Sequence, residues 1–217
     1  MTDSYRPPRQ VRSRKTLDRL YRAAERLFAA AAIVEVTVPQ LAAAADSSVG
    51  AFYARFSGKD DFLAAFYEQY FAEARQRLSG QLAPEVWAGR TAEEVVRGVI
   101  ALRADYYVSR RALLAPLLLH VRLKGDERFV RPARLLSDDM FARYRELLAC
   151  PRTDLPAAPP LDTVRHGVIA VDAGLREYFV FGRGSSATSA RHRAFVDDCA
   201  TMLWLLLARA AAAKGAK

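Results

Sequence analysis

Residues 37–56 read TVPQLAAAADSSVGAFYARF. Thr37 and Gln40 have the spacing of a capping box, in which the threonine hydroxyl accepts the amide of Gln40 and the glutamine side chain reaches back to the amide of Thr37. Pro39 falls in the first turn, where its missing donor costs nothing. This segment therefore predicts a short helix with a well-marked beginning.

A sharp turn and a further short helix follow. Asp46 and Ser47 turn the chain, and Ser47 or Ser48 caps a helix that runs to Phe56. Ala42 is small enough for two helices to cross closely, and apolar contacts come from Leu41, Ala45, Phe52 and Phe56. The major groove of DNA, about 12 Å wide, admits one α-helix while a second helix lies across it. The pair predicts a helix-turn-helix that reads DNA.

Helical periodicity continues on both sides of this pair. Before it, apolar residues recur at i, i+3, i+4 and i+7 from Leu17 to Phe28, and after it Ser57 and Asp60 mark the start of a long helix to about residue 82. Further helices are expected over 91–110, 112–124, 127–149, 161–181 and 189–213. No segment sustains a two-residue alternation, so the chain is predicted to be all-α with about nine helices.

Charge and composition further limit the classes of protein to which this chain can belong. The 217 residues carry a net charge of +9, and residues 1–22 hold seven basic against two acidic side chains. A basic arm beside a helix-turn-helix favours a polyanionic partner. No segment offers the roughly 20 apolar residues of a membrane span, and the N-terminus lacks the apolar core of a secretory signal. Cys150 and Cys199 have no CxxC or histidine partner, which is typical of reduced residues in a cytoplasmic protein.

The segment from about residue 14 to 65 resembles the N-terminal domain of the TetR family of transcriptional regulators. The resemblance lies in Leu27-Phe28, Thr37-Val38, Leu41-Ala42, Ser48-Val49-Gly50-Ala51-Phe52-Tyr53, Phe56, Lys59 and Phe62-Leu63. This chain departs from the family at three positions: Ala32 and Asp46 stand where glycine is usual, and Ser47 stands where an apolar residue is usual. Asp46 tolerates the left-handed turn conformation better than most residues do.

The resemblance implies a set of DNA contacts. Backbone phosphates would be held by Thr37, Ser48, Tyr53 and Lys59. Bases would be approached by Val49, Gly50, Ala51 and Arg55, where a valine or alanine can touch a thymine methyl and an arginine can bind guanine with two hydrogen bonds. Arg14 and Lys15 would add phosphate or minor-groove contacts.

The same resemblance implies the organisation of the chain. Residues 1–57 would form the DNA-binding domain with its basic arm, and residues 58–217 a helical domain for ligand binding and dimerisation. The helices at 161–181 and 189–213 would pair with their two-fold mates, so that a homodimer reads a palindromic operator. A small apolar or aromatic effector would release a repressor from that operator.

Candidate effector contacts are Arg103, Tyr106, Tyr107 and His120, which place polar tips on apolar helices. Plain packing explains the first three equally well, and the apolar run before His120 favours a core histidine with a hydrogen-bond partner. The spacing of histidines, cysteines and carboxylates predicts no metal site. The sequence contains no glycine-rich phosphate-binding loop, so no cofactor is expected. No nucleophile and base are paired in the sequence, so an enzyme is not expected. Two alternatives remain open: a helical protein that binds DNA through charge alone or serves as an interaction module, and an all-helical enzyme.

Overall fold

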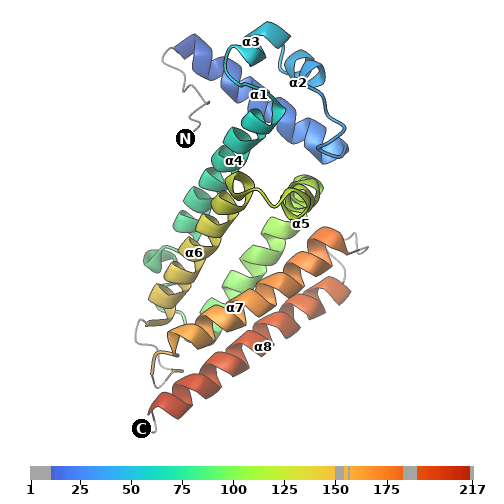
Figure 1. Ribbon diagram of the computed structural model, residues 1–217. Helices are drawn as coiled ribbons and strands as arrows, with labels where there is room; N and C mark the ends of the chain where they lie inside the picture. Colours follow the sequence, from blue (N-terminus) through green and yellow to red (C-terminus); the bar gives the residue numbers. More distant parts are fainter. Residues whose placement is uncertain (1–10, 150–153, 156, 183–189, 216–217) are drawn as a thin grey trace. The chain divides into compact units, whose positions relative to one another are not determined.

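The computed structural model describes residues 11–149, 154–155, 157–182 and 190–215 (Figure 1). These residues form eight α-helices, one short 3-10 helix and one short π-helical segment, without a β-strand in the described ranges. The prediction of an all-α chain is confirmed. The described residues fall into two compact units, one comprising residues up to Glu73 together with Ala112–Arg134, the other Ala74–Arg111 together with residues from Leu135 onward.

The first unit contains the predicted helix-turn-helix. Its elements are α1 (Val11–Ala30), α2 (Val38–Ala44), α3 (Val49–Tyr53), the first part of α4 (Lys59–Gln81), the end of α5 (Ala92–Lys124) and the start of α6 (Glu127–Ala149). Its core is built on edge-to-face and tilted aromatic pairs, with ring centroids 5.2 Å apart for Phe56 and Phe62 and 5.5 Å apart for Phe28 and Phe66. These rings fix α1 and the residues just after α3 on the beginning of α4.

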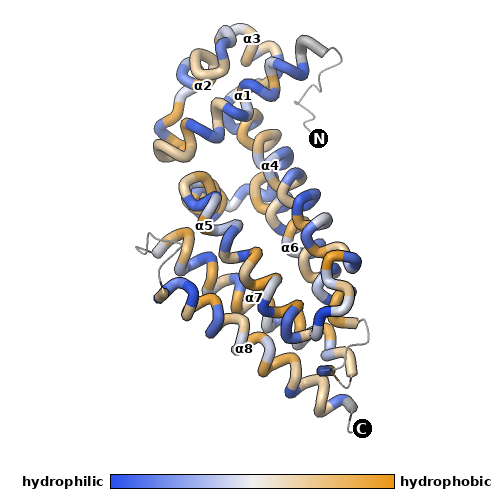
Figure 2. Tube along the Cα trace, turned by 180° about the vertical axis from the view of Figure 1, so that it is seen from behind, coloured by the Kyte–Doolittle hydropathy of each residue, from blue (hydrophilic) through white to orange (hydrophobic). Residues whose placement is uncertain are grey.

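The second unit contains the rest of α4, α5 and α6, the 3-10 helix η1 (Pro84–Trp87), α7 (Leu161–Arg176), the π-helical segment η2 (Glu177–Phe181) and α8 (Ala190–Gly215). Helices α7 and α8 lie side by side in both views (Figures 1 and 2). Gly167 allows this close approach, because a Cβ there would lie 2.7 Å from a methyl of Leu203 and 2.8 Å from one of Leu206.

Two helix boundaries differ from the sequence-based expectation. We predicted a break at residue 111, but α5 is continuous over Ala92–Lys124 and runs through Pro116, and no glycine or proline adjoins residue 111 to end the helix there. We also predicted that the helix beginning near Ser48 runs to Phe56, but α3 ends at Tyr53. There the backbone tightens, with the amide of Arg55 bonded to the carbonyl of Phe52 at 3.0 Å.

Within the described ranges, every helix is too short or too polar to cross a bilayer.

Candidate functional site

The beginning of α2 has the predicted capping box. Thr37 Oγ1 accepts the amide of Gln40 at 3.4 Å, and Gln40 Oε1 accepts both the amide of Thr37 at 2.7 Å and its hydroxyl at 2.9 Å. The hydroxyl of Thr37 therefore already has a partner within the protein. Thr37 remains exposed at the surface of the first unit.

The turn between α2 and α3 is fixed by backbone geometry. Asp46 has a φ of 48°, in the left-handed region, and the amide of Ser47 bonds back to the carbonyl of Ala42 at 2.9 Å. This is the turn conformation expected of Asp46. Its carboxylate lies 3.0 Å from the guanidinium of Arg19 on α1, and Arg26 on α1 donates to the carbonyl of Ala44 at 3.0 Å. Sequence reasoning missed both arginine contacts, although the seven-residue spacing of Arg19 and Arg26 places them on one face of α1.

Helix α3 separates a buried face from an exposed one. Ser48 caps it by accepting the amide of Ala51 at 3.0 Å, and Phe52 is buried in the aromatic core. On the other face, Tyr53 is 53% exposed and Val49 is 39% exposed. Gly50 and Ser48 are also exposed, whereas Ala51 and Arg55 are half-buried. A five-residue helix thus displays a phenol, a hydroxyl and a small apolar patch together.

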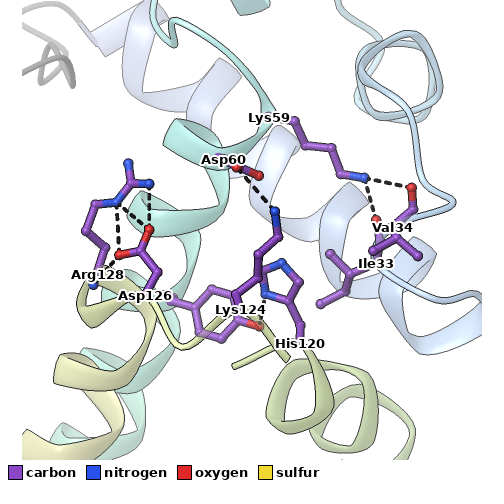
Figure 3. A network of polar contacts seen from close by, with 9 residues as sticks. Ile33, Val34, Lys59, Asp60, His120, Lys124, Asp126 and Arg128 are labelled. Carbon is purple, nitrogen blue, oxygen red and sulfur yellow. Dashed lines mark hydrogen bonds and ion pairs between the residues drawn. The ribbon is translucent and has the colours of Figure 1, made fainter. Parts of the chain in front are cut away.

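The remaining predicted DNA contacts lie on α1 and at the start of α4. Arg14 and Lys15 are exposed on α1. Lys59 is half-buried, and its ammonium donates to the carbonyl oxygens of Ile33 and Val34, in the connection between α1 and α2 (Figure 3). Burial lowers the pKa of Lys59, Lys124 lowers it further, and Asp60 opposes the change. An ammonium has three N–H donors, so Lys59 retains one beyond its two carbonyl partners.

The structure does not bring the four predicted effector contacts together. His120 belongs to the first unit, where it is buried against the rings of Tyr67 and Phe129. Tyr67 donates its one hydroxyl hydrogen to the carbonyl of Leu117 at 2.8 Å, so Nδ1 of His120 donates to Tyr67 Oη at 3.1 Å. His120 is therefore a core residue with a hydrogen-bond partner.

The other three candidates lie on α5 in the second unit. Arg103 donates to Asp172 on α7 through Nε at 2.9 Å and Nη2 at 2.7 Å, and to Tyr107 Oη at 2.7 Å. Tyr107 in turn donates to the second oxygen of Asp172 at 2.8 Å. Burial alone would lower the pKa of Arg103, but the carboxylate of Asp172 raises it above its ordinary value. Sequence reasoning missed Asp172, which lies 69 residues from its partner.

A cavity of about 360 Å³ adjoins this network in the second unit. Arg103 and Tyr106 line it, whereas Tyr107 and His120 do not. Sequence reasoning missed most of its wall, including Arg77 and Leu78 on α4 and Arg110 on α5. Within the described ranges no cluster of histidine, cysteine and carboxylate side chains could hold a metal ion.

Comparison with known proteins supports the fold and the family. Residues 20–66 match the family model described as bacterial regulatory proteins, tetR family. No curated protein matches the sequence. Among solved structures, Salmonella enterica GusR has a TM-score of 0.67 at 22% identity, covering 88% of this chain and 95% of its own.

Two further structural neighbours are FadR proteins solved with acyl-CoA molecules. The transcriptional regulator FadR from Bacillus subtilis, in complex with stearoyl-CoA, has a TM-score of 0.61 at 14% identity and covers 88% of this chain and 97% of its own. Thermus thermophilus FadR, a TetR-family repressor in complex with lauroyl-CoA, has a TM-score of 0.53 at 22% identity, with coverages of 88% and 93%. The family model matches residues 20–66, across the helix-turn-helix, and the described fold is of the same type as these solved structures.

Proposed function

We propose that the chain is a homodimeric repressor that binds a palindromic operator and leaves it when a small-molecule effector binds. The observation that carries the DNA-binding part is the exposed face of α3. This face turns Tyr53 and Val49 outward while the opposite side of the same helix is anchored by Phe52. Gly50 is exposed beside them, so one side of this short helix forms a contiguous surface that a partner can contact.

The proposed contacts follow from the hydrogen-bond donors and charges that each side chain does not already use within the protein. Ser48 accepts the amide of Ala51, which leaves its O–H to donate to a phosphate. Tyr53 offers its phenol, and Arg14 and Lys15 offer cations to the backbone. Base edges would meet Val49, Gly50, Ala51 and Arg55 in the major groove. Thr37 and Lys59 would contribute less, because their polar groups already bind the protein.

Dimerisation through α7 and α8 is the second part of the proposal. Met202, Leu205 and Leu206 lie on one face of α8 by their spacing, and all three are exposed in the single chain. Ile169 on α7 is also exposed. A two-fold partner would cover these side chains and present two copies of α3 to successive turns of the same groove.

The effector part of the proposal places a small, partly apolar molecule in the cavity lined by Arg103 and Tyr106. The two FadR neighbours hold acyl-CoA molecules, which supports a ligand site in a fold of this type. Such a ligand can weaken DNA binding only by binding more tightly to the conformation that does not fit the operator.

Selection from a pool of random DNA duplexes tests the proposal. We expect the protein to recover a palindrome and to prefer it over bulk DNA by at least about 10³-fold. Arg55→Ala should weaken the preference at particular base pairs, whereas Tyr53→Phe should lower affinity for all sequences alike. Arg145→Ala, which removes an exposed arginine of α6, is the matched control and should change neither. Recovery of no motif, with binding that only follows the salt concentration, would favour the charge-only alternative.

A further inference from the structure

The cavity of the second unit has the size of a small-molecule site. Its volume of about 360 Å³ is at the lower end of the range for ligand pockets in proteins. At roughly 30 Å³ for a water-sized group, it has room for about a dozen such groups. Its walls come from α4 and α5, with Leu82 just after α4 and Leu136 of α6 added.

Positive charge exceeds negative charge on the wall of this cavity. Three guanidinium groups line it, from Arg77, Arg103 and Arg110, against the single carboxylate of Asp105. Among the residues that the structure describes, neither Arg77 nor Arg110 has a hydrogen bond or an ion pair. Two cations at the wall are therefore available to a ligand, and one carboxylate opposes them.

Arg103 is fixed where it lines the cavity. Its side chain is only 11% exposed, and its Nε and Nη2 atoms are held by Asp172 and Tyr107. The guanidinium also lies over the ring of Tyr106, 5.4 Å from its centroid. Nη1 is the nitrogen that these bonds leave for another acceptor. Because its neighbours hold it, this donor would lose little conformational freedom on binding an anion.

The rest of the wall is mostly apolar. Gln81, Tyr106 and Ser109 add uncharged polar groups, and the apolar residues are Ala74, Leu78, Leu82, Val99, Leu102 and Leu136. An apolar wall with a few cationic groups suits a molecule that has an acidic head and a hydrocarbon body. A neutral hydrocarbon would leave the cationic groups at the wall without a counter-charge, and a purely polar anion would leave the leucines without contacts.

We infer that this cavity binds an amphipathic anion of about a dozen non-hydrogen atoms, with a carboxylate or phosphate head held by Arg77, Arg103 and Arg110 and an apolar body against Leu78, Leu82 and Leu136. The inference rests on the proposed function in taking this cavity as the effector site. It narrows the effector from small apolar or aromatic compounds to acidic amphiphiles.

Isothermal titration of the full-length protein with three ten-carbon probes tests the inference. The probes are decanoate, decyl phosphate and 1-decanol, titrated at one ionic strength in a phosphate-free buffer. We expect at least one of the two anions to bind about tenfold or more tightly than the alcohol, since a charge-assisted hydrogen bond is worth about one power of ten in affinity. The anion that binds more tightly identifies the head group. Equal binding of the alcohol and both anions, or no binding of either anion, would overturn the inference.

Variants locate the site. Arg77→Gln and Arg110→Gln should each weaken binding of the preferred anion about tenfold while leaving 1-decanol unchanged. Asp105→Asn should tighten anion binding, because it removes the opposing charge. Arg145→Gln carries the same change in net charge away from the cavity and should bind as the wild type does. Equal loss in Arg145→Gln and Arg110→Gln would show a general charge effect and contradict the site.

The titration separates this inference from the proposed function. An anion that binds through Arg77 and Arg110 but leaves operator affinity unchanged would support the site and overturn release by an effector at this cavity. Specific operator binding by a protein that shows no preference for the anions would leave the DNA-binding proposal standing and overturn this inference alone.

Discussion

Replacing Asp172 by asparagine should strongly destabilise the protein, because it leaves the guanidinium of Arg103 with no counter-charge in a nearly buried site. The side chains of this pair are 11% and 16% exposed, and Arg103 donates twice to one carboxylate oxygen. Removing one partner of a buried ion pair costs about 3–5 kcal/mol, and the slight exposure places the expected cost near 3 kcal/mol. For a chain of this size, that corresponds to a fall in Tm of roughly 6–12 °C.

Asp139→Asn provides the matched control in the same unit. Asp139 pairs with Arg75 at 2.6 Å, but each side chain is 38% exposed, so losing this carboxylate should cost less than about 1 kcal/mol. Thermal unfolding followed by circular dichroism, at one protein concentration, measures both variants. Equal falls in Tm would refute the reasoning from burial. The double variant Arg103→Met, Asp172→Leu should be more stable than Asp172→Asn, because no charge is left unpaired.

Three further predictions test other parts of the structure. Asp46→Ala should cost about 1 kcal/mol in urea unfolding because of the φ of 48°, whereas Asp46→Gly should cost almost nothing, since the ion pair with Arg19 is exposed. Gly167→Ala should lower stability by about 1–3 kcal/mol through the contacts with Leu203 and Leu206, whereas Gly174→Ala on the same helix, with open space around its Cβ, should raise it by up to about 1 kcal/mol. Burial, and then Lys124 and Lys59, lower the pKa of His120 below its ordinary 6.5, while Asp60 opposes them. Below pH 6.5 the unfolded chain therefore binds a proton at His120 before the folded chain does. The contribution of His120 to the free energy of unfolding should be complete above pH 6.5 and should decrease as the pH falls below that value. His120→Gln should flatten this dependence of the urea midpoint, and an unchanged slope would exclude His120 as its source.

Local features of the fold could be predicted from the sequence because their causes lie within four residues. The capping box of Thr37 and Gln40, the left-handed Asp46 and the cap by Ser48 each depend on neighbours in the chain. The length of α3 could not be predicted in the same way. Its last turn tightens beside Phe56, a residue held by the aromatic core rather than by the local sequence.

Contacts between distant helices could not be predicted, because periodicity gives the face of a helix but not the neighbour it meets. The sequence shows Arg103 and Tyr107 as polar tips on an apolar helix, yet Asp172, which binds both, lies on α7. His120 has the same sequence pattern as those two residues but lies in the core of the other unit. The pattern alone could not distinguish a cavity wall from a packed interior.

Substitutions of the polar groups in the helix-turn-helix differ in whether they would change DNA affinity alone or the stability of the fold as well. Ser48 caps α3 and Lys59 holds the connection between α1 and α2, so replacing either would change the free energy of unfolding along with any phosphate contact. Tyr53 has a phenol exposed on α3, while the neighbouring Phe52 supplies the anchoring contacts in the core. Tyr53→Phe therefore removes a surface hydroxyl and leaves the fold intact. A loss of operator affinity in this variant without a change in Tm can be assigned to the DNA contact itself, which neither Ser48 nor Lys59 permits.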